Sequence, residues 1–271
     1  MTSRTQDPWT YLLFVKYAHL YLHELLGMEH KAEPEVNGIC KIFDEFKIEN
    51  RSRVLDFSCG IGRHSIRLSK RGYEVIGYDP SSFFLEKARE KLKLENQNTR
   101  ISFYQGDPYH VSKVLSRKNQ SDFKAIIIMD NSIGYATRKK DLMIFKNLLS
   151  LSSKSGTILI TQTENRDWRI KNFEPCIIAD YGTIQTHAQW KFNLEDSIFE
   201  GILRFYRKRN RTLYLLLNLP IHLRLYSLHE LKQILHESGW NLVKSYGNIS
   251  TLEPASTDRA EIITVSTNKS K

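Results

Sequence analysis

The chain has 271 residues, with 40 lysines and arginines against 30 aspartates and glutamates, which gives a formal net charge of +10. Hydrophobic residues make up 41% of the sequence, enough to build a core, and this excludes a mainly disordered or fibrous protein. Apolar runs such as Ala125–Met129 are too short to span a bilayer. The start of the chain has no basic stretch followed by an apolar one, so we expect a cytoplasmic protein of one elaborated domain.

Two further features of the composition leave function open. The densest basic cluster flanks a predicted turn and comprises Arg204, Arg207, Lys208, Arg209 and Arg211. It suits a solvated hairpin tip, and it also suits a surface that binds phosphates or a membrane. Three cysteines, Cys40, Cys59 and Cys176, form no C-x-x-C pair, so neither a disulfide framework nor a metal site is predicted. We interpret all three as buried and inert.

The first fifty residues are predicted to be helical. Apolar residues from Trp9 to Leu25 recur at steps of three and four, which indicates one amphipathic helix. The same spacing from Val36 to Phe46 indicates a second helix after Pro34. We therefore expect residues 1–50 to form a helical cap.

Strands and helices then alternate. The predicted strands are Arg53–Phe57, Tyr73–Tyr78, Ile101–Tyr104, Lys124–Met129 and Thr157–Thr161, and the helices between them include Arg63–Arg71, Ser82–Leu94 and a segment around Leu142–Leu149. Alternation of this kind is typical of an α/β fold with a doubly wound, mostly parallel sheet and helices on both faces.

The alternation stops after the fifth strand. Three β segments follow, Ile184–Phe192, Ile198–Tyr206 and Leu213–Leu219, and we place an antiparallel insertion at residues 180–220. Ser227 and Glu230 then have the spacing of a capping box and start a helix that ends at Gly239. The last two strands, Asn241–Tyr246 and Ala260–Ser266, complete the sheet, so its domain comprises residues 51–179 and 221–271.

A glycine loop carries the clearest functional signal. Gly60 and Gly62 lie at the turn from the first strand to a helix, where backbone N–H groups can approach a ligand. Asp79 ends the second strand, and a carboxylate there can accept hydrogen bonds from both hydroxyls of a ribose. Together these features predict a site for a nucleoside.

The charge of the loop separates two kinds of cofactor. Dinucleotide-binding loops carry a third glycine, and Ser65 occupies that position here. Asp56, at the end of the first strand, would repel a pyrophosphate but would attract the sulfonium and ammonium groups of S-adenosylmethionine. The loop therefore favours S-adenosylmethionine.

The same residues resemble a known family. Val54–His64 is similar to the first motif of class I S-adenosylmethionine-dependent methyltransferases, and Gly77–Ser81 is similar to the second. The segments Gly106-Asp107, Ser132–Tyr135 and Leu223–Ser227 resemble the regions after the third strand, after the fourth strand and before the last helix. Departures from the family pattern stand at Phe57, Ser58 and Pro108.

The resemblance covers roughly residues 9–266. It implies a seven-stranded sheet whose final strand is antiparallel, with S-adenosylmethionine as cofactor and S-adenosylhomocysteine as product. The cofactor-binding residues that it implies are Asp56, Ser58, Gly60, Gly62, Arg63, Asp79, Pro80, Gly106, Asp107 and Asn131. Asp107 would contact the adenine amino group.

The acceptor of the methyl group is less well defined. Asp130–Ile133 contains no proline, unlike the motif of enzymes that methylate base amino groups, and no cysteine is placed for carbon methylation of pyrimidines. We predict a small-molecule acceptor, held between the helical cap and the insertion. The insertion acts as a substrate lid or as a dimer contact, and the protein is a monomer or a homodimer. An RNA methyltransferase and a non-catalytic nucleotide-binding module are the alternatives. No catalytic residue is assigned; the candidates are Tyr135, His187, His222 and Tyr226, each of which also suits a structural role.

Overall fold

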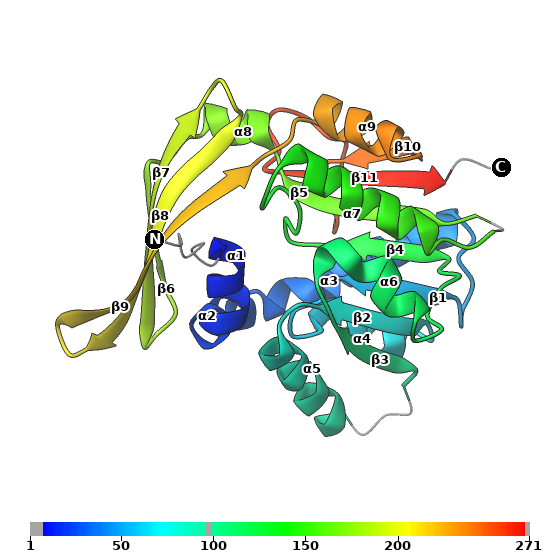
Figure 1. Ribbon diagram of the computed structural model, residues 1–271, viewed down its shortest axis with the longest axis horizontal. Helices are drawn as coiled ribbons and strands as arrows, with labels where there is room; N and C mark the ends of the chain where they lie inside the picture. The colour runs from blue at the N-terminus through cyan, green and yellow to red at the C-terminus, as the bar shows by residue number, and fades with distance from the viewer. Residues whose placement is uncertain (1–7, 96–98, 155, 269–271) are drawn as a thin grey trace, which may run out of the picture.

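The structure is a computed structural model that describes residues 8–95, 99–154 and 156–268. A seven-stranded sheet with helices on both faces forms its main body, and a four-stranded antiparallel sheet stands to one side of it (Figure 1). Residues 1–7 of the expected helical cap and the last three residues of the expected sheet domain lie outside the described residues. No helix within the described ranges has the length and apolar character needed to cross a membrane.

The large sheet has the strand order β10-β11-β5-β4-β1-β2-β3. Its strands are β1 (Arg53–Phe57), β2 (Glu74–Asp79), β3 (Ile101–Gln105), β4 (Ala125–Ile128), β5 (Ile158–Glu164), β10 (Trp240–Tyr246) and β11 (Glu261–Asn268). β1 to β5 pair in parallel, whereas β11 runs antiparallel to both β5 and β10. The predicted doubly wound sheet is confirmed. The strand order reverses between β1 and β4, and in such sheets ligands bind beyond the carboxyl ends of the strands at that point.

Helices cover both faces of this sheet. They are α3 (Ala32–Glu45), α4 (Arg63–Lys70), α5 (Ser82–Leu94), α6 (Val111–Ser116), α7 (Arg138–Ser150), α8 (Arg166–Lys171) and α9 (Leu228–Glu237), with short 3-10 turns at Glu29–Lys31 and Pro108–His110. The sequence of β4 is apolar throughout because both faces of the strand are buried. Ile126 and Ile128 belong to a core cluster with α7 and α9, and Ala125 and Ile127 belong to a second cluster with α3. A parallel strand buried on both faces needs no alternation.

The predicted insertion is larger than expected. Its sheet contains four strands in the order β6-β7-β8-β9, namely β6 (Cys176–Asp180), β7 (Ile184–Asn193), β8 (Ile198–Arg209) and β9 (Thr212–Arg224). The prediction of three strands was wrong because β6 is a short edge strand of mixed burial that follows Pro175, so its sequence carries little periodicity. Cys176 lies on this edge and is exposed, so our interpretation of it as buried was also wrong; Cys59 is buried, and Cys40 is only partly so.

The N-terminal segment is interrupted rather than one regular helix. It comprises α1 (Trp9–Tyr11), a π-helical turn η1 (Leu12–Lys16) and α2 (Ala18–Gly27), with a break at Tyr17. Leu13 and Leu20 pack against Phe205 and other residues of the small sheet. Ala18, two residues before Leu20, packs against the main body. The segment therefore lies between the two sheets, as Figure 1 shows.

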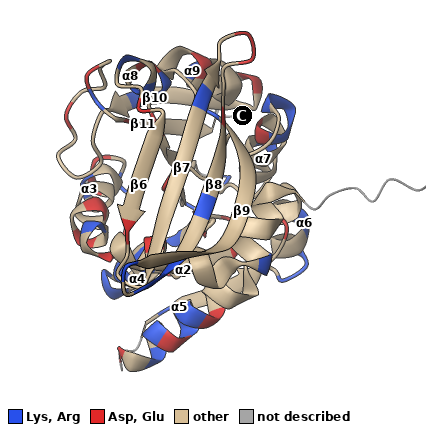
Figure 2. Cartoon of the chain, turned by 90° about the vertical axis from the view of Figure 1, so that its left-hand side faces the viewer, with Lys and Arg blue, Asp and Glu red and all other residues tan. Residues whose placement is uncertain are grey.

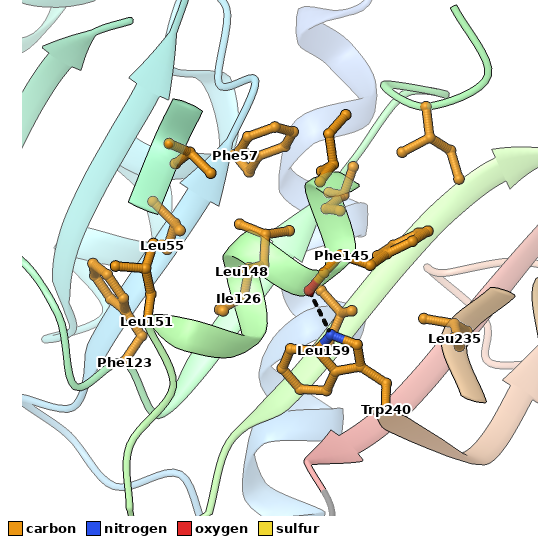
Figure 3. Packing of buried hydrophobic residues seen from close by; sticks show 14 of the residues in the cluster. Leu55, Phe57, Phe123, Ile126, Phe145, Leu148, Leu151, Leu159, Leu235 and Trp240 are labelled. Atoms are coloured by element: carbon orange, nitrogen blue, oxygen red, sulfur yellow. Dashed lines mark hydrogen bonds between the residues drawn. The ribbon is translucent and has the colours of Figure 1, made fainter. Parts of the chain in front are cut away.

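Trp240 supplies a test of the packing beneath the large sheet. Its side chain is fully buried, and its indole N–H donates a hydrogen bond of 3.0 Å to the backbone carbonyl of Phe145 on α7 (Figure 3). We expect Trp240→Phe to lower the free energy of unfolding by about 1–3 kcal/mol, because the buried hydrogen bond from the indole is lost. Trp168→Phe, at a half-buried site, is the control and should cost less. Urea unfolding curves measure both; equal losses would contradict the prediction.

Candidate functional site

A cavity of about 540 Å³ lies at the carboxyl ends of the parallel strands. Loops after β1, β2, β3 and β4 form its floor and sides, and the N-terminal helices complete it. The lining from the strand ends and loops includes Ser58–Ile61 and Arg63 after β1, Asp79 and Pro80 at the end of β2, Gln105–Tyr109 at the end of β3, and Met129, Asp130, Ser132, Ile133 and Tyr135 after β4. The N-terminal segment contributes Thr10, Tyr11, Phe14, Val15, Tyr21, Leu25 and Met28.

The loop after β1 is a tight turn with several left-handed residues. Ser58, Gly60 and Gly62 have φ values of +61°, +53° and +73°. A Cβ at Gly62 would lie 3.1 Å from the ring of Phe103, so this position has little room for a side chain. The turn brings backbone N–H groups to the cavity just before α4 begins, as expected for a loop that approaches a ligand closely.

Asp79 fixes this loop and faces the same cavity. Its two carboxylate oxygens accept hydrogen bonds from the backbone N–H of Gly60 (2.9 Å) and of Ser81 (2.8 Å). Burial raises the pKa of Asp79 to about 6, and the nearby Asp56 adds to the rise, while the two backbone donors oppose it. Each oxygen has a second lone pair, so the carboxylate can still accept hydrogen bonds from a ligand.

The loop after β3 forms another side of the cavity. A Cβ at Gly106 would lie 2.1 Å from the hydroxyl of Tyr78, so only glycine fits there. Asp107 accepts a hydrogen bond of 2.8 Å from the N–H of Tyr109 and remains about half exposed at the rim. A cavity with Asp79 and Asp107 beside a glycine turn fits a nucleoside that carries ribose hydroxyls and a base amino group.

Three residues of the predicted cofactor set lie outside the cavity lining. Asp56 is buried below the loop and accepts a hydrogen bond of 2.5 Å from Ser65. Gly62 packs against the core, and Asn131 bridges β4 and β5 by accepting a hydrogen bond of 3.3 Å from the N–H of Glu164. These three residues shape the site from behind.

Arg63 belongs to a buried ionic network that the sequence did not reveal. It donates a hydrogen bond of 2.5 Å to Glu35 and another to Asp130, and His64 lies 2.8 Å from the same Glu35 oxygen. Arg63, His64 and Asp130 line the cavity. Glu35 lies on α3, and no local pattern links residues so far apart in the chain. The charge of Arg63 is therefore already matched by two carboxylates.

Of the four catalytic candidates, the structure brings Tyr135 to the cavity. Tyr135 packs edge-on against Trp9, with ring centroids 5.3 Å apart, and burial raises its pKa. Tyr226 is buried and donates a hydrogen bond of 2.5 Å to Asp141. His187 on β7 packs against Tyr206, and His222 on β9 lies near Trp9; neither belongs to the cavity lining.

Comparison with known proteins assigns the chain to a family. Residues 28–245 match the family described as a methyltransferase domain. The chain belongs to this family. It is 27% identical over 237 residues to the glycine/sarcosine N-methyltransferase of Aphanothece halophytica, covering 83% of this chain and 78% of that protein. It is 30% identical over 116 residues to YqeM of Bacillus subtilis, 42% of this chain and 44% of the length of that relative.

The fold has a solved counterpart. An S-adenosylmethionine-dependent methyltransferase of Clostridium acetobutylicum superposes with a TM-score of 0.74 at 14% identity, over 93% of this chain and 98% of that one. The chain is a class I methyltransferase whose cofactor is S-adenosylmethionine, as its motifs implied. When bound, this cofactor supplies a methyl group on a positively charged sulfur, open to attack by a lone pair. Asp79, Asp107 and the turn from Ser58 to Gly60 are the residues that would hold it.

The ionisation of Asp79 predicts how cofactor affinity depends on pH. Ribose hydroxyls bind the ionised carboxylate, so a bound cofactor lowers the pKa of Asp79 from its value of about 6. Affinity should therefore fall as the pH drops below about 6. Asp79→Asn should weaken S-adenosylhomocysteine binding by about 1.5–3 kcal/mol at neutral pH, the range for hydrogen bonds to charged groups, and should remove this pH dependence.

Calorimetric titration from acid to neutral pH measures both effects. Glu33→Gln, at a surface carboxylate on α3, is the control and should bind S-adenosylhomocysteine as the unmodified protein does. Unchanged affinity in Asp79→Asn would show that Asp79 does not hold the ribose.

Proposed function

We propose that this methyltransferase transfers the methyl group of S-adenosylmethionine to an amine nitrogen of a small molecule. The observation that carries the proposal is the charge of the cavity. Among the described lining residues, Asp130 pairs with Arg63, which also pairs with Glu35, whereas Asp79, Asp107 and Asp141 pair with no lysine or arginine of the lining. An excess of negative charge in an enclosed space favours a cationic acceptor.

The cover of the cavity supports a small acceptor. Phe14 packs against Tyr21 and Tyr135, with centroids 5.1 and 5.4 Å apart, and Tyr21 packs against Phe84 across the cavity wall at 6.4 Å. These contacts hold the N-terminal helices over the start of α5 and the loop after β4. A volume of about 540 Å³ has to hold both the cofactor and the acceptor, which suits a small molecule better than a folded RNA.

The positions of the basic residues argue against RNA as the acceptor. The cluster noted in the sequence lies on β8 and its hairpin with β9, and none of its residues belongs to the cavity lining: Arg204, Arg207, Lys208, Arg209 and Arg211. Lys208 in this cluster pairs with Asp180. Figure 2 shows scattered basic residues on the small sheet and no continuous basic path across the described part of this face. Phosphate-backbone binding requires such a path.

Because the charge of Arg63 is already paired, it also limits which amines the cavity can accept. An amino acid such as glycine carries a carboxylate that needs a cation or several N–H donors when it is buried. Among the described lining residues, Arg63 is the one arginine and there is no lysine. The guanidinium of Arg63 already donates hydrogen bonds to the carboxylates of Glu35 and Asp130. The A. halophytica relative is named for glycine and sarcosine, which supports amine chemistry. For this chain we infer an amine without a carboxylate, such as an alkylamine, amino alcohol or amino sugar.

We also propose a role for the antiparallel sheet as the support of the cover. Leu13 and Leu20 of the N-terminal helices pack against Phe205 and Leu219 of this sheet. Its last strand reaches the cavity loop directly, because the N–H of Arg224 donates a hydrogen bond of 2.8 Å to the carbonyl of Gly134. The sheet would thereby hold in place both the lid helices and the segment that carries Tyr135.

A methylation panel tests the proposed function. We expect S-adenosylmethionine bearing a labelled methyl group to label ethylamine, ethanolamine or glucosamine at least about tenfold faster than glycine or sarcosine, because a buried unpaired carboxylate costs more than 1.4 kcal/mol. Mass spectrometry identifies the methylated nitrogen. Catechol and a mixed transfer RNA pool provide oxygen and nucleic-acid acceptors. Preferred labelling of either, or of glycine, would contradict the proposal.

A further inference from the structure

Four aromatic side chains of the cavity wall form one continuous group. Phe14 and Tyr21 come from the N-terminal segment, Phe84 comes from α5 and Tyr135 from the segment after β4, and all four line the cavity. The ring centroid of Phe14 lies 5.1 Å from that of Tyr21 and 5.4 Å from that of Tyr135. Tyr21 in turn contacts Phe84, with centroids 6.4 Å apart. We call these four residues the aromatic group.

A fifth ring supports the aromatic group from outside the cavity lining. Trp9 packs against Phe14 and Tyr135, with centroids 5.9 and 5.3 Å apart, and is not itself a lining residue. The backbone beside Tyr135 is held as well, because the N–H of Gly134 donates a hydrogen bond of 3.1 Å to the buried carboxylate of Asp141. The aromatic group is therefore a surface that is formed before any acceptor binds.

Within the described part of the chain, no cation of the protein uses the faces of these rings. Lys140 lies 4.5 Å from the ring centroid of Tyr109, which is another lining residue. No described lysine or arginine stacks in this way on any ring of the aromatic group. The face of an aromatic ring is negative and attracts a cation, most strongly where water is excluded. The aromatic group can therefore bind a cation that comes from outside the protein.

The side chains of the cover suit an ammonium that carries methyl groups. The described lining residues of the N-terminal segment include no charged or amide side chain, whereas Asp79, Asp107 and Asp130 lie at strand ends and loops on the other sides. A primary ammonium has three N–H donors, and each of them needs an acceptor when it is buried. A methylated ammonium presents methyl groups in their place, and these can pack on ring faces that also attract its charge.

We propose that the aromatic group binds a methylated ammonium, so that the enzyme prefers secondary and tertiary amines as acceptors and continues methylation to a quaternary ammonium. The inference rests on the proposed amine chemistry and names the class of amine. The acids of the cavity attract the positive charge, and the rings contact the methyl groups around it. Phe14 and Tyr135 then determine this specificity, because they join the rings of the cover to the segment after β4.

The last methylation needs no base from the protein. A protonated tertiary amine releases its one N–H proton to water, and the neutral nitrogen then has a lone pair. This nitrogen bonds to the methyl carbon while the carbon–sulfur bond breaks and its electron pair stays on sulfur, which yields a quaternary ammonium and S-adenosylhomocysteine. One positive charge passes from sulfur to nitrogen, so the aromatic group borders a cation throughout the step. In earlier rounds the new N-methylammonium loses a proton to water before the next transfer.

Binding to the protein loaded with S-adenosylhomocysteine tests the aromatic group without turnover. The probes are choline, a quaternary ammonium; ethanolamine, its unmethylated counterpart; and 3,3-dimethylbutan-1-ol, which has the shape of choline without its charge. We expect calorimetry to give choline an affinity at least about tenfold higher than that of either other probe, as for a cation in contact with aromatic rings that exclude water. Equal affinities for choline and the uncharged alcohol would overturn the inference.

Substitutions in the aromatic group should act selectively on choline. Phe14→Leu and Tyr135→Leu each remove a ring and should weaken choline binding about tenfold, while the affinities for ethanolamine and S-adenosylhomocysteine stay within about threefold. Tyr135→Phe keeps the ring and should keep the choline affinity within about threefold. Phe173→Leu, at an exposed ring outside the lining, is the control. If the leucine variants do not fold, the comparison of choline with the uncharged alcohol on the unmodified protein decides.

A role limited to the cofactor would give a different result, because the sulfonium of S-adenosylmethionine is a methylated cation too. Rings that serve only this sulfonium would make Phe14→Leu and Tyr135→Leu weaken the binding of S-adenosylmethionine more than that of S-adenosylhomocysteine. Choline binding would then be the same in these variants as in the unmodified protein. That pattern would overturn the inference.

A methylation series separates this inference from the proposed function. We expect kcat/KM for transfer of a labelled methyl group to rise at least about tenfold from ethanolamine to N,N-dimethylethanolamine, with choline identified as the product by mass spectrometry. An enzyme that methylates ethanolamine faster than the dimethyl compound would overturn this inference alone. An enzyme that methylates no amine would overturn the proposed function and this inference with it.

Discussion

The buried guanidinium of Arg63 is the constraint on which the site depends. A charge that is almost fully removed from water has to be paired, and Arg63 finds Glu35 on α3 and Asp130 after β4. These pairs join the helical cap, the start of α4 and the loop after β4 at one point. They also use up the positive charge that the cavity would otherwise offer. The acidic character of the cavity therefore follows from the same pairs that hold its walls together.

The cofactor side of the site could be predicted from sequence because its parts are local. Asp79 ends β2 directly, and the glycine turn directly follows β1, so strand alternation alone brings them to one edge of the sheet. The capping box predicted at Ser227 and Glu230 is present for the same reason, since both of its hydrogen bonds lie within one turn of α9. The edge strand β6 escaped prediction because its pairing with β7, not its own pattern, makes it a strand.

The acceptor side could not be predicted in this way, because it is built from parts that are distant in the chain. Glu35 on α3 lies 28 residues before Arg63 in the chain, and only the packing of α3 against α4 brings their charges together. The N-terminal segment, with its π-helical turn at Leu12–Lys16, is a second such part. This segment contacts the small sheet on one side and the main body on the other. An uninterrupted amphipathic helix presents one apolar stripe, which suits contact on a single side.

Asp79 shows how a buried carboxylate in the cavity comes to suit a neutral partner. Its pKa is raised, and burial is the main cause. Asp79 is surrounded by backbone N–H donors, so its charge is stabilised in place and its remaining lone pairs suit neutral hydroxyl groups. Fixed backbone donors thus favour a nucleoside, with its neutral hydroxyl groups, at this carboxylate.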